Sequence, residues 1–276
     1  MPRVSIITVC YNAAATLERT ITAVLAQTWP DLEYIVIDGG STDGTLEIIR
    51  RYRDRITVFV SEKDEGISDA FNKGVRRATG DYVGIVNADD WPEPGNATFA
   101  VEDLQADPGA AFVFGDLTLH RNGKAVYRHN GDAGYEAGFG LSMGRLNHPT
   151  VICRLEMFER VGLFDTRYSV AMDFDWLLRL HKSGFRGLYD PRIQGHMETG
   201  GVSVRLMHRA LRESRQAALA AGLSRSRVWV FYWLASFKAG LRILVETRLS
   251  YGLAQWLRQS LFRSLETLKK GDGSGV

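Results

Sequence analysis

The sequence has little of what marks a secreted or membrane-spanning protein. Among 276 residues it has two cysteines, Cys10 and Cys153, and two thiols without metal-type spacing predict neither a disulfide framework nor a zinc site. The apolar run Val4–Val9 begins almost at the N-terminus, and no charged region followed by a longer apolar stretch is found there. No signal peptide is therefore predicted. We therefore expect a cytoplasmic protein of ordinary globular composition.

A long apolar run is also missing. The most apolar stretch, Val228–Phe237, is too short to cross a bilayer. This stretch and Leu253–Leu268 combine aromatic residues with flanking or interspersed basic ones, a pattern typical of amphipathic helices that lie in a membrane interface. The alternative is that their apolar faces pack on the rest of the chain or form a homodimer interface.

Charge is divided unevenly along the chain. Residues 201–276 contain 13 Lys and Arg against 4 Asp and Glu, a net charge of +9, whereas residues 1–200 contain 21 against 28, a net charge of −7. Such asymmetry favours an anionic partner for the C-terminal segment, either a membrane surface or a nucleic acid. The aromatic residues of that segment lie among aliphatic ones, unlike the stacking platforms of single-strand binders, so we expect a peripheral protein on the inner face of the cell membrane and no nucleic acid.

Strand-like and helix-like segments alternate through the first 120 residues. The expected strands are Val4–Val9, Tyr34–Asp38, Ile56–Val60 and Asp81–Val86, and the expected helices are Ala14–Gln27, Thr45–Arg53 and Gly66–Ala78. Further strands are expected at Phe112–Phe114, Leu117–Leu119 and Arg192–Met197, a hairpin turn at Arg121–Lys124, a connector over Gly131–Arg145, and helices at Leu155–Val161 and Met172–His181. The alternation predicts an α/β fold with a mainly parallel sheet flanked by helices.

Carboxylates follow two of these strands. Asp38 ends one strand, and Asn87-Ala88-Asp89-Asp90 follows another. Ligands of parallel α/β sheets bind at the carboxyl ends of the strands, so these side chains are expected on one rim. Carboxylate oxygens bind Mg²⁺ and Mn²⁺, which are usually shared with substrate phosphates. The pattern thus favours a metal–phosphate site over a simple polar turn.

Several motifs, taken in order, resemble the family 2 glycosyltransferases of the GT-A fold, of the bacterial type that builds polysaccharides or glycolipids. They are Val4–Asn12, Asp38–Gly44, Asp64–Gly74, Asn87–Asp90, His148–Thr150, Gly162–Asp165 and Ala171–Leu180. The resemblance covers roughly residues 3–203. It implies a GT-A (Rossmann-like) catalytic domain at 1–203, with a nucleotide-sugar-binding half at 1–120 and an acceptor half at 121–203. A basic helical extension at 204–270 and a disordered tail at 271–276 would follow.

The resemblance also implies the reaction. It is an inverting transfer of a sugar from a nucleotide-diphosphate sugar, with UDP-sugars favoured, to a hydroxyl of a lipid-linked or polysaccharide acceptor. A divalent metal, Mn²⁺ or Mg²⁺, would stabilise the departing diphosphate. A nucleotide-sugar-binding protein without turnover is the alternative, which the presence of Asp173 beside Asp89 and Asp90 disfavours.

Donor-site roles follow from the matching positions. Asp90 would bind the metal, and Asp89 would face either metal or ribose. Asp38 would accept a hydrogen bond from the nucleobase, and Lys73 would reach the diphosphate. The remaining donor-site residues, which would line the nucleotide-sugar pocket, are Thr8, Tyr11, Asn12 and Asn87.

Acceptor-site roles are carried over in the same way. Asp173 would take the proton from the acceptor hydroxyl, although an acidic residue at a helix N-terminus can also simply complement the helix dipole. His148 would contact acceptor or diphosphate, and His196 would either approach the metal or be a satisfied surface histidine. The loop Glu198–Ser203 would close over the donor. Asp64 or Ser68 is expected to cap the helix at Gly66–Ala78.

Overall fold

The computed structural model describes residues 1–199 and 206–248 of the chain. Its two compact units divide between Val228 and Trp229. The predicted segments Leu253–Leu268 and Gly271–Val276, and all but the start of the Glu198–Ser203 loop, lie outside the described residues.

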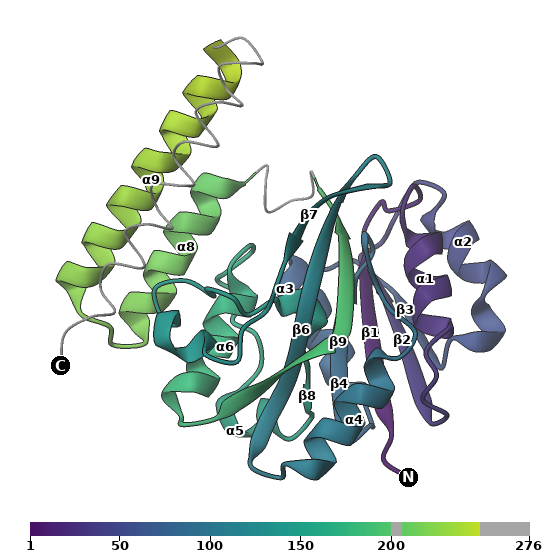
Figure 1. Ribbon diagram of the computed structural model, residues 1–276. Coiled ribbons are helices and arrows are strands. Elements are labelled where there is room, and N and C mark those ends of the chain that lie inside the picture. The colour runs from purple at the N-terminus through teal and green to yellow at the C-terminus, as the bar shows by residue number, and fades with distance from the viewer. Residues whose placement is uncertain (200–205, 249–276) are drawn as a thin grey trace. The chain divides into compact units, whose positions relative to one another are not determined.

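One sheet forms the centre of the first unit (Figure 1). The strand order is β3-β2-β1-β4-β8-β6-β9-β5, and β7 pairs with β6. The strands are β1 Val4–Cys10, β2 Leu32–Asp38, β3 Val58–Ser61, β4 Tyr82–Asn87, β5 Asp90–Pro92, β6 Ala110–Arg121, β7 Lys124–His129, β8 Ile152–Arg154 and β9 Arg186–Glu198. Strands β3, β2, β1 and β4 are parallel, and β9 is parallel to β6. The short strand β8 runs antiparallel to both β4 and β6, so the predicted α/β sheet is confirmed as a mixed, mostly parallel one.

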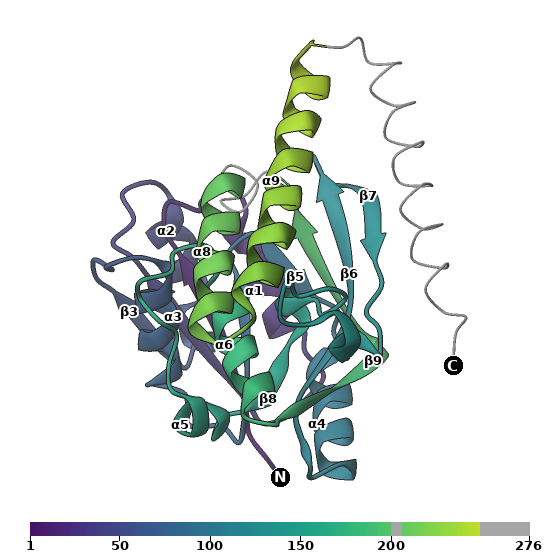
Figure 2. The ribbon, with the colours of Figure 1, turned by 90° about the vertical axis from the view of Figure 1, so that its left-hand side faces the viewer.

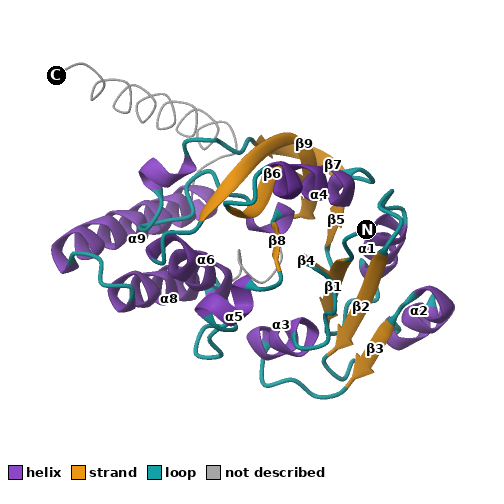
Figure 3. Ribbon diagram, turned by 90° about the horizontal axis from the view of Figure 1, so that it is seen from below, coloured by secondary structure: helices purple, strands orange, loops and turns teal. Residues whose placement is uncertain are grey.

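Helices cover both faces of the parallel strands. The helices are α1 Leu17–Leu25, α2 Thr45–Arg51, α3 Ile67–Val75, α4 Asn96–Ala106, α5 Met157–Val161, α6 Met172–Lys182, α8 Met207–Ala220 and α9 Arg225–Arg248, with 3₁₀ turns at Arg53–Arg55, Tyr135–Gly138 and His148–Thr150. Figure 3 shows α1 and α2 on one side of β1–β3 and α3 on the other. This arrangement explains why all seven residues of β1 are buried, as expected for a strand covered on both faces.

The predicted hairpin at Arg121–Lys124 joins β6 and β7, which stand out as a long ribbon in Figure 2. Asn122 and Gly123 both have positive φ, 53° and 73°, as the tight turns of hairpins require. The runs Phe112–Phe114 and Leu117–Leu119 both belong to β6. Between them the strand register shifts, and a Cβ on Gly115 would lie 1.9 Å from the carbonyl oxygen of Ile193. Only glycine therefore permits this approach of two backbones.

The carboxyl ends of the parallel strands meet at one edge, as predicted. In the strand register Cys10 lies opposite Asp38, Val9 opposite Asn87, and Asp38 opposite Ser61. The residues that follow these strands therefore share one rim of the sheet.

The first unit runs from Met1 to Val228 and includes α8, which packs against α6. The boundary of the catalytic domain at residue 203 stays a prediction. Among the described residues, no helix is long and apolar enough to cross a membrane.

Candidate active site

Three residues from separate loops meet at the rim beside β1 and β2. A Cβ placed on Gly39 would lie 2.7 Å from Oδ2 of Asp64 and 3.5 Å from Cδ2 of Tyr11. Tyr11 is 65% exposed, so its ring does not serve as core packing and is available to stack on a planar group. Asp64 was expected only as a possible helix cap, and its place in this group could not be seen from the sequence.

The predicted helix caps are wrong. Gly66 precedes the first residue of α3 and no side chain caps that helix. Ser68 instead donates its hydroxyl to the carbonyl of Tyr168 at 2.5 Å, and Asp64 accepts a hydrogen bond from Lys73 at 2.6 Å.

Asp38 holds the loop after β2. It is fully buried, and its carboxylate accepts hydrogen bonds from the backbone of Gly40 and Ser41 and from the hydroxyls of Ser41 and Ser61. Asn12 braces the same loop, because its Oδ1 accepts a hydrogen bond from the Thr42 amide at 2.9 Å. These contacts shape the rim, and the direct nucleobase contact of Asp38 stays a prediction.

Thr8 lies below the rim rather than on it. The residue is 0% exposed, and its hydroxyl oxygen lies 3.1 Å from the Tyr34 hydroxyl that donates to it. The structure thus does not bring Thr8 to the open edge, where a nucleoside could contact its side chain.

Lys73 sits among three carboxylates. Its Nζ lies 2.6 Å from Asp64, 3.1 Å from Glu62 and 3.2 Å from Asp69. Burial acts to lower the pKa of Lys73, but the hydrogen bonds to these carboxylates raise it above its ordinary value. The lysine is therefore charged and close to the Tyr11–Gly39–Asp64 group, and its contact with a diphosphate stays a prediction.

The Asp89–Asp90 pair follows β4 at the same rim. Asp90 is 2% exposed, and its burial, followed by the charge of Asp89, raises the pKa of Asp90 to about 8. Burial also raises the pKa of Asp89. The Nδ2 of Asn87 donates to Oδ2 of Asp90 at 3.0 Å, whereas Oδ1 of Asn87 and Oδ1 of Asp90 are buried without a hydrogen-bond partner.

Two unpartnered buried oxygens beside a second carboxylate fit a cation. Buried polar atoms normally have partners, and these oxygens are hard ligands of the type that Mg²⁺ and Mn²⁺ prefer. No group of three or more His, Cys, Asp or Glu side chains able to hold a metal occurs within the described ranges. A site of one or two carboxylates completed by substrate phosphates needs no such group.

His196 faces away from Asp90. In the antiparallel pairing of β5 with β9, His196 lies opposite Trp91, and Met197 lies opposite Asp90. Paired residues share a face and neighbours alternate. The His196 ring stacks on Trp91 at 5.2 Å, and its nitrogens lie 2.8 Å from Glu93 and 3.1 Å from His120. These contacts agree with the satisfied histidine rather than with the metal ligand.

Arg19 of α1 is a neighbour of the acidic pair that the sequence did not indicate. Its guanidinium lies 3.4 Å from the centroid of the Trp91 ring, and its charge acts to lower the pKa of both Asp89 and Asp90. No motif marks this arginine, because it reaches the rim only through the packing of α1 against β5.

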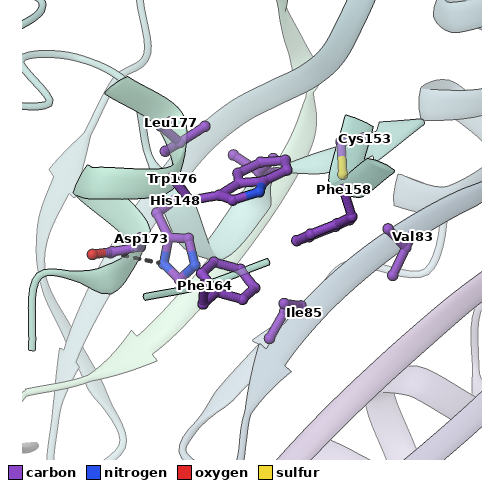
Figure 4. A pocket seen from close by; sticks show the side chains of 10 residues that line it. Val83, Ile85, His148, Cys153, Phe158, Phe164, Asp173, Trp176 and Leu177 are labelled. Atoms are coloured by element: carbon purple, nitrogen blue, oxygen red, sulfur yellow. Dashed lines mark ion pairs between the residues drawn. The ribbon is translucent and has the colours of Figure 1, made fainter. Parts of the chain in front are cut away.

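His148 and Asp173 lie side by side in a largely apolar pocket. Nδ1 of His148 lies 3.2 Å from Oδ2 of Asp173, and both side chains are about 15% exposed. Figure 4 shows the imidazole turned toward the carboxylate, with Val83 and Ile85 of β4 across the pocket. Ile85 precedes Asn87 by two residues, so the pocket adjoins the strand that leads to the acidic pair.

The rest of α6 behaves as predicted. Asp175 points away from Asp173 and pairs with Arg179 at 2.9 Å. The residues expected in the core are buried, namely Trp176, Leu177, Leu178 and Leu180.

Comparison with known proteins agrees with this geometry. The family model described as glycosyl transferase family 2 matches residues 5–163. The chain belongs to glycosyl transferase family 2. It is 30% identical over 192 residues to a PGL/p-HBAD biosynthesis glycosyltransferase of Mycobacterium tuberculosis, covering 64% of this chain and 69% of that protein. It is also 30% identical to chondroitin synthase of Escherichia coli, over 67% of this chain, but it spans only 27% of that protein's length.

Solved structures share the fold. The mannosyltransferase PcManGT from Pyrobaculum calidifontis, in complex with GDP-Man and Mn²⁺, superposes with a TM-score of 0.63 at 23% identity and covers 96% of this chain and 81% of that one. Staphylococcus aureus TarS in complex with UDP superposes with a TM-score of 0.62 at 17% identity, covering 92% of this chain and 78% of that one. At these identities the likeness establishes a GT-A-like architecture for this family 2 glycosyltransferase.

Proposed function

We propose that this family 2 glycosyltransferase transfers a sugar, with inversion, from a nucleotide-diphosphate sugar to an acceptor hydroxyl in a metal-dependent reaction. The observation that carries the proposal is the pairing of His148 with Asp173 in a pocket lined in part by β4, the strand that ends at Asn87 just before Asp89 and Asp90. An inverting transfer needs a proton acceptor for the attacking hydroxyl and a cation that stabilises the leaving diphosphate.

Each group has a distinct task in this proposal. Asp90 and Asn87, with Asp89, would hold Mn²⁺ or Mg²⁺, which when bound offsets the charge of the leaving diphosphate. Tyr11, Gly39 and Asp64 would form the nucleoside end of the site. Asp173 would accept the proton of the attacking hydroxyl.

The nucleotide that carries the donor sugar is also part of the proposal. We favour UDP-sugars. PcManGT was solved with GDP-Man and TarS with UDP-GlcNAc, so both nucleotides belong in the test.

We also propose a lipid-linked acceptor and a peripheral place on a membrane surface. Support comes from α9, where five large apolar residues are between 43% and 66% exposed: Trp229, Val230, Trp233, Leu234 and Phe237. Their spacing places them on one side of a helix, and aromatic residues are the usual anchors of interfacial helices.

A donor screen on the full chain tests the proposal. UDP-, GDP- and dTDP-sugars are added with and without Mn²⁺, and thermal unfolding is followed because a ligand of the native state raises the unfolding temperature. We expect metal-dependent stabilisation by one class of donor and release of its nucleotide when acceptor is present. Binding without any turnover would instead indicate a nucleotide-sugar-binding protein.

The variant Asp173→Asn separates binding from chemistry. It should bind donor normally and lose transfer by about 10²-fold or more, the size of a general-base contribution. Transfer at the normal rate would overturn the assignment of the base.

A further inference from the structure

Glu213 of α8 lies beyond the part of the chain that the family model matches and is only 5% exposed. Its Oε2 accepts hydrogen bonds from the backbone amides of Ser169, Val170 and Ala171 at 2.9, 2.8 and 3.1 Å. Its Oε1 accepts from the Ser169 hydroxyl at 3.0 Å and from Arg209 at 2.8 Å. A buried carboxylate with five donors is fixed in place and fixes its partners in turn.

The three amides belong to the residues that lead directly into α6. Asp173 is the second residue of that helix, so Glu213 holds the backbone just before the proposed base. The first amides of a helix have no partner within it, and negative charge near a helix N-terminus is stabilising. From another helix, Glu213 accepts a hydrogen bond from the amide of Ala171, the N-cap residue of α6, and places its negative charge near that helix N-terminus.

The segment before α6 is anchored on its other side by α3. Ser68 donates to the Tyr168 carbonyl, and Asn72 exchanges two hydrogen bonds of 2.9 Å with the backbone of Phe164. Residues 164–171 are therefore held between α3 and α8. The hydrogen bonds from α3 end at Tyr168, whereas those from α8 reach the three residues that adjoin α6.

We propose that Glu213 is a positioning residue for the transfer reaction, which sets the place of Asp173 through the backbone of Ser169–Ala171. This inference rests on the proposed function. Misplacement of a reacting group by about 1 Å can cost on the order of 10²-fold in rate. The hydrogen bonds that hold the donor-site residues Asp38, Asn12, Asp64 and Asn87 do not involve Glu213, so donor binding should not depend on it.

The test compares three substitutions of Glu213 in the full chain. Glu213→Ala removes all five hydrogen bonds and should lower kcat about 10- to 100-fold, with the KM for donor unchanged. Glu213→Gln keeps the shape and one acceptor oxygen for the amides, and should recover most of kcat. Arg212→Ala, which removes an exposed charge from the neighbouring position on α8, is the matched control and should transfer at the normal rate.

Two results would overturn the inference: an unchanged kcat in a folded Glu213→Ala variant, or donor KM and kcat worsening together. If the alanine variant does not fold, Glu213→Asp decides, because it keeps the charge but withdraws the carboxylate by one methylene. A lowered kcat with unchanged donor KM then supports positioning, and a normal kcat refutes it. If the unmodified chain transfers no sugar from any donor, it is the proposed function that fails.

Discussion

Nδ1 of His148 lies 3.2 Å from Oδ2 of Asp173, while Oδ1 of the same carboxylate accepts the Phe174 amide at 2.7 Å. Both oxygens of the proposed base therefore have a partner, and its plane is fixed. In the tautomer with a proton on Nδ1, the imidazole donates to the carboxylate. This geometry leads us to expect that His148 orients Asp173, a role more specific than the contact with acceptor or diphosphate that the motif suggested.

Replacing His148 should slow transfer without weakening donor binding. We expect His148→Phe to lower kcat about tenfold or more, because the carboxylate loses its second partner. His148→Asn should retain more activity, since its amide nitrogen can occupy the place of Nδ1. The measurements are kcat and the donor Kd. An unchanged kcat in His148→Phe would indicate that the ring acts through its shape alone.

Removing the buried carboxylate of Asp90 should abolish the metal dependence of donor binding. Asp90→Ala deletes the unpartnered Oδ1 that we assign to the cation, so Mn²⁺ should no longer enhance the thermal stabilisation by donor. Asp103→Ala, on α4, removes a carboxylate away from the rim and is the control. Undiminished Mn²⁺ enhancement in Asp90→Ala would place the metal elsewhere.

A methyl group on Gly39 should weaken donor binding. In Gly39→Ala the new Cβ would lie 2.7 Å from Oδ2 of Asp64, so Asp64 must turn away from its place beside Tyr11. We expect the donor Kd to rise several-fold with little change in unfolding temperature, because only the end of one side chain must move. In Gly44→Ala the nearest atom is 3.5 Å away, and this control should bind donor normally.

The charge of Glu213 should stabilise the fold at neutral pH and not in acid. Burial acts to raise the pKa of Glu213, but hydrogen bonds from Arg209 and from the backbone of residues 169–171 lower it below its ordinary value of 4.5. A depressed native pKa contributes stability above pH 4.5 that is lost as pH falls through the native pKa. At pH 7, Glu213→Gln should cost about 1–2 kcal/mol in free energy of unfolding, as expected for losing charge-assisted hydrogen bonds.

Urea unfolding of both proteins between pH 3 and pH 8 measures this difference. The gap should be constant above about pH 5 and shrink in more acidic solution. A gap that persists unchanged at pH 3 would show that the charge of Glu213 contributes nothing.

The exposed aromatic residues of α9 should bind the chain to anionic vesicles. Trp233 and Phe237 stack with their ring centroids 6.0 Å apart, so Trp233→Glu removes one anchor and leaves its neighbour unsupported. We expect cosedimentation with phosphatidylglycerol vesicles to fall about tenfold. Ser236→Glu adds the same charge without removing an aromatic ring and should fall less. Equal losses would indicate a purely electrostatic effect.

The sequence alone determined the architecture and the edge of the sheet where the site lies. Strands of β-branched residues that alternate with amphipathic helices leave a mostly parallel sheet as the natural way to bury both faces. Because such strands end at a common edge, the positions of Asp38, Asn87 and Asp90 along the chain were enough to place them on one rim.

Only the tertiary structure decided which side chains face one another. Periodicity tells which face of its own element a residue occupies, but not which distant segment packs against that face. Thr8 and Tyr11 lie in one motif, yet the first is buried under Tyr34 and the second is exposed at the rim. The pairing of His148 with Asp173, and of Glu213 with the start of α6, joins residues 25 to 44 positions apart. Such contacts depend on the position of each helix on the sheet, and that position is determined by the packing of the whole domain.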